Sequence, residues 1–201
     1  MTRGRRANVF PFLGEARVIE RVPKFTIAPI AGEEADHLLL RSDEYMAALY
    51  PAESNHLVSS ESLRSGDALF LGAFTQAPHE EGVASIAASH RPSVKRCIGC
   101  VAARFYREQG YAEIKRLFVD EAFRGNAIAK RLMSAVERGV VAQGVHCARL
   151  EMGIYQPEAE TLYRALGYRT IPPFGDYLLD PLSQFLEKAL GDTDERLDPG
   201  D

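Results

Sequence analysis

One stretch of the sequence limits the fold more than any other, because a strand pattern, a loop of small residues and a helix pattern follow one another without a gap. The strand pattern covers Glu113–Val119 and ends in an acidic turn. Beyond the loop, apolar side chains recur at every fourth position, at Ile128, Leu132, Val136 and Val140. This spacing predicts an amphipathic helix over Ala127–Gln143, with Gly144 just past its end. A strand, a tight loop and a helix in this order predict an α/β unit.

The remaining segments continue this alternation. Strands are predicted at Phe25–Ile30, Ala68–Phe74, Cys97–Tyr106, Tyr111–Val119, Cys147–Met152, Arg169–Ile171 and Ser183–Leu186. Helical spacing and end signals predict two further helices, at Glu33–Leu49 and Pro157–Leu166. A turn at Glu108–Gly110 joins two of the strands, so part of the sheet is antiparallel. We therefore expect an α/β fold with a mixed sheet.

Length and composition narrow the class of protein. The 201 residues correspond to about one domain, and 46% hydrophobic with 26% charged residues is typical of a globular chain. No apolar run reaches the roughly 18 residues of a membrane span, so we expect no membrane partner. The net charge of −4 argues against nucleic-acid binding. Three cysteines cannot all pair with one another, which indicates reduced thiols and a cytoplasmic protein.

The two ends of the chain differ in charge from the middle. Residues 1–24 carry a net charge of +4 without a secretory h-region, and we interpret them as a flexible extension that ends in a short paired segment. Residues 191–201 hold five acidic residues and one Arg, which is typical of a solvated tail. Polar, Ala-rich residues 75–95 are interpreted as an extended hairpin loop. The predicted folded domain is therefore residues 25–190.

The small-residue loop before the long helix has the properties of an anion site. Backbone N–H groups at a helix start point toward one spot, and the helix dipole adds partial positive charge. Small side chains let a phosphate approach the backbone. The alternative is a tight turn that needs small residues for packing alone. The loop is neither a Walker A motif nor a dinucleotide fingerprint, because the Gly-Lys-Ser/Thr sequence and the G-x-G-x-x-G spacing are both missing.

The loop resembles the acetyl-CoA pyrophosphate loop of the GCN5-related N-acetyltransferases, whose pattern is Arg/Gln-x-x-Gly-x-Gly/Ala. Here it stands as Arg124-x-x-Ala127-x-Ala129, with Gly125 after the arginine. Ala127 departs from the pattern: alanine costs free energy if the position requires a positive φ, and is harmless if the position already lies in the helix.

A second motif supports the resemblance. Residues 156–168 are similar to the family helix Asn-x-x-Ala-x-x-Leu-Tyr-x-x-x-Gly-Phe, with Gln156 for Asn and Tyr168 for Phe. Residues 45–56 and 174–181 also resemble a bacterial subgroup of uncharacterised acetyltransferases. The resemblance implies a single central, mostly antiparallel sheet flanked by helices.

The resemblance implies transfer of an acetyl group from acetyl-CoA to a primary amine, by direct attack in a ternary complex and without a metal. The acceptor would be a small molecule or a peptide. A bulged strand end, the loop and a second helix start would bind the cofactor through Leu117, Phe118, Val119, Arg124, Gly125, Asn126, Ala127, Ile128, Ala129 and Gln156. A homodimer is the default oligomer.

The reaction needs a base and an acid for its proton transfers. Glu113 lies where relatives carry a glutamate base, and the alternatives are that it pairs with Lys115 or Arg116 or faces solvent. Glu151 on the neighbouring strand is the reserve base, and a water relay is a third option. Tyr163 would protonate the departing thiolate, and the alternative is an ordinary half-buried tyrosine on an amphipathic helix.

Two further groups need interpretation. The polar cluster Glu53, Ser54, Asn55 and His56 could line the acceptor site, or could only cap and turn the chain. Cys97 and Cys100 have CxxC spacing, but residues three apart in a strand point to opposite faces, so we expect packed small side chains rather than a metal or redox pair.

Two other classes of function stay open from the residues alone. One is a non-catalytic acyl-CoA-binding or sensory domain, and the other is an interaction protein whose loop is purely structural.

Overall fold

The computed structural model describes residues 24–54, 58–64, 67–76 and 95–191. The N-terminal extension, the acidic tail and the predicted loop over 75–95 therefore lie almost wholly outside the described residues. The same holds for Asn55 and His56, and the side chain of Glu53 is not described.

Seven strands form one sheet. They are β1 (Phe25–Pro29), β2 (Ala68–Gln76), β3 (Lys95–Tyr106), β4 (Tyr111–Val119), β5 (Cys147–Gly153), β6 (Arg169–Ile171) and β7 (Ser183–Ala189). Their order across the sheet is β1-β2-β3-β4-β5-β7-β6, and only β4 and β5 run parallel. The predicted mixed, mostly antiparallel sheet is confirmed.

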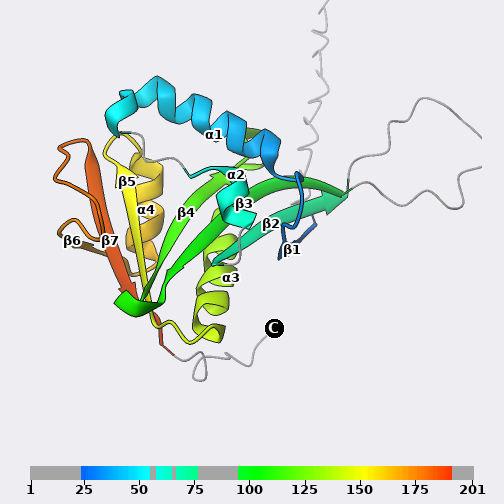
Figure 1. The fold of residues 1–201 in the computed structure, drawn as a ribbon. Coiled ribbons are helices and arrows are strands. Elements are labelled where there is room, and N and C mark those ends of the chain that lie inside the picture. The colour runs from blue at the N-terminus through cyan, green and yellow to red at the C-terminus, as the bar shows by residue number, and fades with distance from the viewer. Residues whose placement is uncertain (1–23, 55–57, 65–66, 77–94, 192–201) are drawn as a thin grey trace, which may run out of the picture.

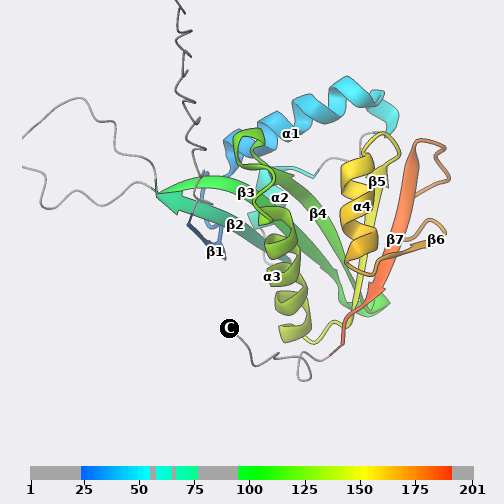
Figure 2. The same ribbon diagram turned by 180° about the vertical axis from the view of Figure 1, so that it is seen from behind.

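Helices cover both faces of the sheet (Figures 1 and 2). One face carries α1 (Asp36–Leu49) and α2 (Ser60–Arg64), which bury Leu38, Leu39 and Leu63 in the smaller core. The other face carries α3 (Ile128–Ala142) and α4 (Pro157–Ala165), which supply the larger core. The four periodic residues of α3 are all buried there, as their spacing predicts. The sequence analysis did not predict the five-residue α2.

The parallel strands β4 and β5 separate soon after they meet. They pair only through Ala112 with Ala148 and Glu113 with Arg149, although both strands continue well beyond these positions. Past the paired part, β4 contains a bulge, in which Val101 of β3 faces both Arg116 and Leu117. Arg116 has a φ of 58°, so the chain turns out of the regular strand at this residue. The C-terminal halves of β4 and β5 are therefore not paired with each other.

The side chains of Cys97 and Cys100 do not point to opposite faces of the sheet as predicted. Cys97 and Cys100 both lie in the smaller core under α1, so the expectation that they point to opposite faces is wrong. The reason is an irregularity in β3: Phe74 faces Cys97 and Ala73 faces Gly99, which leaves Ile98 as an extra residue. Both thiols are buried and unpaired, as packed small side chains are. Burial raises the pKa of the Cys97 thiol to about 11.

Candidate active site

The loop between β4 and α3 places two residues in the left-handed region. Gly125 has a φ of 81° and Ala127 a φ of 55°. Asn126 between them donates side-chain hydrogen bonds to the carbonyl oxygens of Phe123 (3.1 Å) and Arg124 (3.3 Å), which fixes the turn. Alternation of left-handed and right-handed residues is the geometry in which successive N–H groups form an anion-binding concavity.

The start of α3 is open for an anion. Ala127 is the N-cap residue and provides no side-chain hydrogen bond, and the first turn holds no acidic residue. The first-turn N–H groups therefore have no side-chain acceptor, and the helix dipole adds partial positive charge at the same place. Because Ala127 precedes the helix with a positive φ, the interpretation that its position is already helical is wrong. Alanine in this conformation costs about 1–2 kcal/mol.

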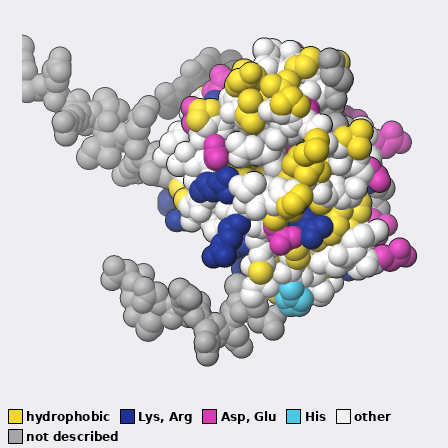
Figure 3. Space-filling model, turned by 90° about the vertical axis from the view of Figure 1, so that its left-hand side faces the viewer, with side chains coloured by type: hydrophobic (Ala, Val, Ile, Leu, Met, Phe, Trp, Pro, Cys, Tyr) yellow, Lys and Arg dark blue, Asp and Glu magenta, His cyan; other side chains and the backbone are white. Residues whose placement is uncertain are grey.

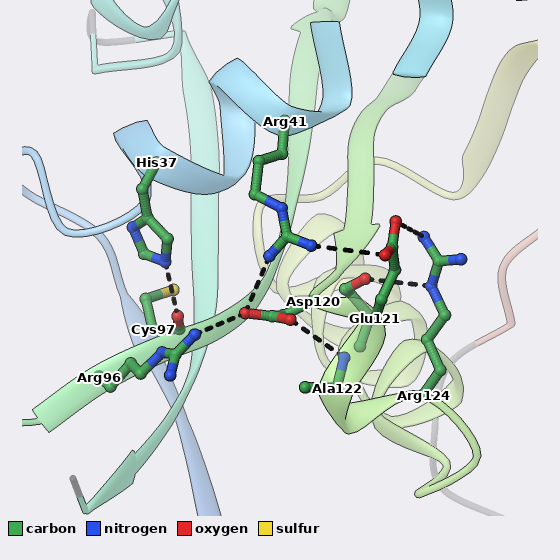
Figure 4. Close-up of polar contacts among 9 residues, drawn as sticks. His37, Arg41, Arg96, Cys97, Asp120, Glu121, Ala122 and Arg124 are labelled. Carbon is green, nitrogen blue, oxygen red and sulfur yellow. Dashed lines mark hydrogen bonds and ion pairs between the residues drawn. The ribbon is translucent and has the colours of Figure 1, made fainter. Parts of the chain in front are cut away.

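A buried carboxylate anchors this loop to two other elements (Figure 4). Asp120 is buried at the end of β4, accepts a hydrogen bond from the Ala122 N–H (3.1 Å), and pairs with Arg41 of α1 (3.1 Å) and Arg96 of β3 (2.7 Å). Burial by itself would raise the pKa of Asp120, but the N–H group and the two guanidinium groups together hold it below its ordinary value. The loop is thereby fixed relative to both α1 and the sheet.

Arg124, the first residue of the predicted cofactor motif, folds back over the end of β4. Its Nε donates to the carbonyl oxygen of Val119 (3.3 Å), and its guanidinium lies 3.8 Å from a carboxylate oxygen of Glu121 (Figure 4). Half of the side chain is exposed, so its outer nitrogens remain accessible to a ligand.

Glu113 is buried on the α1 side of the sheet with both carboxylate oxygens engaged. The Tyr177 hydroxyl donates to Oε1 at 2.6 Å, Nζ of Lys115 lies 3.0 Å from the same oxygen, and the Tyr106 hydroxyl donates to Oε2 at 3.2 Å. Pairing with Lys115, one alternative of the sequence analysis, is therefore present. Burial mainly, and then the charge of Glu113, raise the pKa of Tyr177 and Tyr106.

Arg116 does not pair with Glu113. Its buried guanidinium pairs with Asp43 of α1 and donates twice to the carbonyl oxygen of Val58, at 2.9 and 2.6 Å. The bulge residue of β4 thus holds α1 and the chain before α2 against the sheet.

Glu151 of β5 lies near three tyrosines from different elements. The Ser183 hydroxyl donates to its Oε1 at 2.7 Å. Burial raises the pKa of Tyr50, Tyr163 and Tyr177, and the negative charge of Glu151 adds to the increase in each case. Glu151 therefore lies within electrostatic reach of the end of α1, of α4 and of the segment before β7.

Tyr163 is buried on the inner face of α4, as its helical position predicts. Its ring packs edge-to-face on Tyr168 at 5.7 Å. Burial, with a smaller contribution from Glu151, raises the pKa of its hydroxyl. A tyrosine hydroxyl is protonated near neutral pH even at its ordinary pKa, so Tyr163 has a proton to donate.

The other predicted site residues lie as follows. Gln156 is the half-buried N-cap residue of α4 and forms no side-chain cap bond, and Ser54 is half-buried in a short 3-10 helix, Ala52–Ser54. Phe118, Val119 and Ile128 are buried, so they offer mainly backbone groups to a ligand, whereas Leu117 and Ala129 are partly buried. A hollow of about 430 Å³ lies elsewhere, between β1 and α3.

The sequence analysis missed three polar residues of this region, Tyr177, Asp120 and Ser183. Tyr177 reaches Glu113 from the chain between β6 and β7, and Ser183 reaches Glu151 because β7 pairs with β5. The resemblance of residues 174–181 to a bacterial subgroup of acetyltransferases was a signal that could have identified Tyr177.

Comparisons with known proteins agree with this geometry. Residues 46–168 match the model of the acetyltransferase (GNAT) family. The chain is 38% identical over 153 residues to an IAA acetyltransferase of Azospirillum brasilense, which covers 76% of this chain and 88% of the relative. It is 32% identical over 93 residues to human N-acetylaspartate synthetase, covering 46% of this chain and 31% of that protein.

Solved structures of the same fold include two informative neighbours. A candidate acyl-CoA N-acyltransferase from Klebsiella pneumoniae superposes with a TM-score of 0.63 at 28% identity, over 83% of this chain and 98% of the other. The PaiA N-acetyltransferase of Thermoplasma acidophilum, solved in complex with coenzyme A, has the same fold, with a TM-score of 0.58 at 20% identity over 83% and 99% of the two chains.

The chain belongs to the GNAT acetyltransferase family. It is an acetyltransferase that uses acetyl-CoA as its acyl donor. Within the described residues, no helix has the length and apolar character needed to span a membrane.

Proposed function

We propose that this acetyltransferase transfers the acetyl group directly from acetyl-CoA to a primary amine while both substrates are bound. The separation of β4 from β5 carries this proposal. The uncapped start of α3 lies beyond the end of β4, and Glu113 and Glu151 lie on the opposite, α1 side of the sheet. A thioester between the two strands would therefore meet an amine arriving from the α1 side.

In this proposal the cofactor binds along β4 and the loop that follows it. The pyrophosphate would accept hydrogen bonds from the N–H groups between Gly125 and Ala129, and Arg124 would add a positive charge. The pantetheine amides would pair with the free edge of β4 at Leu117–Val119, as an added strand does. Gln156, at the start of α4, would contact the cofactor from the other side.

Tyr163 is the proposed general acid. As the amine attacks, the bond between the carbonyl carbon and sulfur breaks, and the thiolate of CoA needs a proton. The Tyr163 hydroxyl is protonated at neutral pH, as tyrosine is at its ordinary pKa, and burial raises that pKa further, so it holds a proton to supply. A backbone N–H at the β4 bulge would stabilise the negative charge on the thioester oxygen.

The base that removes a proton from the ammonium is proposed to be Glu113, with Glu151 as the alternative. Glu113 is buried beside Lys115 and two tyrosine hydroxyls. A proton from the ammonium would reach Glu113 through these hydrogen-bonded groups. The proximity of Glu151 to Tyr163 favours the alternative. The acceptor would also contact the Glu53–His56 segment.

The acceptor is proposed to be the amine of a small molecule or peptide, in a cytoplasmic reaction. The names of the two relatives do not indicate one common acceptor, because one refers to IAA and the other to N-acetylaspartate. The three cysteines, all unpaired in the described chain, are consistent with a reducing compartment.

The experiment is a screen of primary amines that follows release of the free CoA thiol, with initial rates measured at varied concentrations of both substrates. Direct transfer predicts intersecting double-reciprocal lines. Parallel lines would indicate an acetyl-enzyme instead, and CoA binding without thiol release from any amine would contradict the proposed reaction.

A further inference from the structure

The chain between β6 and β7 covers Glu113 and then presents two leucines to solvent. Phe174 anchors this segment by packing edge-to-face on Tyr111 at 5.5 Å, and Tyr177 donates its hydroxyl proton to Glu113. The next two residues, Leu178 and Leu179, are 84% and 87% exposed. They are the most exposed large hydrophobic side chains in the described part of the chain.

A second segment brings further apolar surface to the same end of β5. Ile154 and Tyr155 follow β5 directly and are also exposed. The Ile154 N–H donates to the carbonyl oxygen of Leu182 at 3.0 Å, which joins this turn to the segment that carries the two leucines. The Tyr155 ring stacks on Tyr50 at 5.6 Å, and the Tyr155 N–H donates to the Tyr50 hydroxyl at 2.8 Å.

The side of the molecule formed by β6 and β7 carries apolar surface. Figure 3 looks onto this side, and hydrophobic side chains gather there in one area at the upper end and another over the middle. Single exposed hydrophobic residues are normal on a protein surface. Apolar area that gathers beside a candidate catalytic group is more typical of a ligand-binding surface.

Several charged side chains lie on the α1 face of the sheet. Three cations on the same face of the sheet are each paired with a carboxylate: Lys115 with Glu113, Arg116 with Asp43 and Arg149 with Glu187. Glu151, near the end of β5, accepts a hydrogen bond from the Ser183 hydroxyl of β7. The negative charge of Glu151 acts on Tyr50, whose ring stacks on the exposed Tyr155, so a carboxylate lies close to this apolar surface.

We infer that the acceptor is a primary amine attached to an apolar body, aromatic or branched aliphatic, which rests on Leu178, Leu179 and Tyr155 while its amine reaches the carboxylates. This substrate class rests on the proposed function. The hydrogen bond from Tyr177 to Glu113 fixes the position of the residue directly before Leu178 in the chain.

The test compares apolar amines, 2-phenylethylamine and 3-methylbutylamine, with polar amines, ethanolamine and 1,4-diaminobutane. The variant is the double substitution Leu178→Ser and Leu179→Ser, and the control is Leu40→Ser, since Leu40 is 60% exposed on α1. Because all three leucines are exposed, the variants should keep the fold, and calorimetry with CoA checks this.

For the wild type we expect kcat/KM to be at least about tenfold higher for the apolar amines, as apolar contacts of this size provide. The double variant should lose about tenfold with the apolar amines and keep its rate with the polar ones, whereas Leu40→Ser should change neither. Equal use of both amine classes, or an unchanged preference in the double variant, would overturn the inference and leave acetyl transfer intact.

Two other outcomes have separate meanings. If the wild type releases no CoA thiol with any primary amine, the proposed function fails and the substrate class fails with it. If sedimentation shows that the wild type is a dimer and that the double variant is a monomer, the leucines form a contact between two copies of the chain, and the inference is overturned.

Discussion

The hydroxyl of Tyr177 donates a 2.6 Å hydrogen bond to Oε1 of Glu113, so a residue from the chain before β7 closes over the carboxylate that the sequence assigns as the base. Lys115 contacts the same oxygen, and Tyr106 contacts the other. A carboxylate that is buried and hydrogen-bonded in this way is held in one orientation. It can act as a base only if the proton travels through these contacts or if Tyr177 moves aside.

The role of Glu113 can be tested by Glu113→Gln. If Glu113 takes the proton, the rate should fall by about 10²–10⁴, the range for a general base, and the acidic limb of the pH–rate profile should flatten. The control is Glu187→Gln, which also removes a carboxylate paired with a cation, here Arg149 at 2.7 Å, and should leave the profile unchanged. The pH dependence of kcat/KM is the measurement.

A different result would move the base to the neighbouring strand. If Glu113→Gln keeps the acidic limb and Glu151→Gln removes it, Glu151 is the base. This outcome would fit the proximity of Glu151 to Tyr163.

The conformation of Ala127 leads to a prediction about stability. Its φ of 55° disfavours any residue with a Cβ, so Ala127→Gly should raise the free energy of unfolding by about 0.5–1 kcal/mol. The matched control is Ala129→Gly in the first turn of α3, which should lower the free energy of unfolding by up to about 1 kcal/mol. Urea denaturation measures both, and equal losses in the two variants would show that Ala127 is not strained.

Most helices and strands were predictable from the sequence. The helix α3 was predicted to within a residue at each end, because its buried face requires apolar side chains at regular spacing. Each strand was found from its run of apolar and β-branched residues, although β2, β3, β5 and β7 extend beyond the predicted ends. Local periodicity therefore determines most elements of this fold.

Other features depend on contacts that local periodicity does not record. One extra residue, Ile98, turns Cys97 to the same side as Cys100, and the sequence of β3 looks regular despite it. One hydrogen-bond donor to Glu113 is Tyr177, 64 residues further along the chain. The left-handed Ala127 and Arg116 follow from how β4 meets α3 and β3, which no single residue type specifies.

The cofactor loop can be tested by placing a negative charge in it. A Cβ added at Gly125 meets no atom within 4 Å, so a side chain fits there, although the φ of 81° strains it. Gly125→Asp should weaken CoA binding in calorimetry at least about tenfold more than Gly125→Asn, because only the carboxylate repels the pyrophosphate. Aspartate and asparagine both tolerate the left-handed region, so the pair isolates charge. Equal affinities in the two variants would exclude the pyrophosphate from this loop.

The anchor at Asp120 predicts a pH-dependent stability. Its pKa is lowered in the folded protein, so its contribution to stability is complete above the ordinary aspartate pKa of 3.8 and is lost as the pH falls through the lower folded value. Asp120→Asn should therefore cost about 2 kcal/mol at pH 7, and the difference from the wild type should shrink below about pH 4. Denaturant unfolding at several pH values measures this difference.

The control for Asp120 is its neighbour Glu121. This carboxylate is 61% exposed and also faces Arg41 and Arg124, at 3.7 and 3.8 Å. Exposed ion pairs contribute little, so Glu121→Gln should change the free energy of unfolding by less than about 1 kcal/mol at any pH. A similar loss in both variants would mean that burial of Asp120 is unimportant.

The general acid is tested by Tyr163→Phe, which keeps the ring that packs on Tyr168 and removes only the hydroxyl. If this hydroxyl supplies the proton to the departing thiolate, its loss should lower kcat by about 10²–10⁴ while the affinity for CoA in calorimetry stays the same. Tyr168→Phe, at the adjoining ring in the same core, is the control and should keep the wild-type rate. Wild-type turnover by Tyr163→Phe would reduce Tyr163 to a packing residue, and weaker CoA binding with normal turnover would make its hydroxyl a cofactor contact.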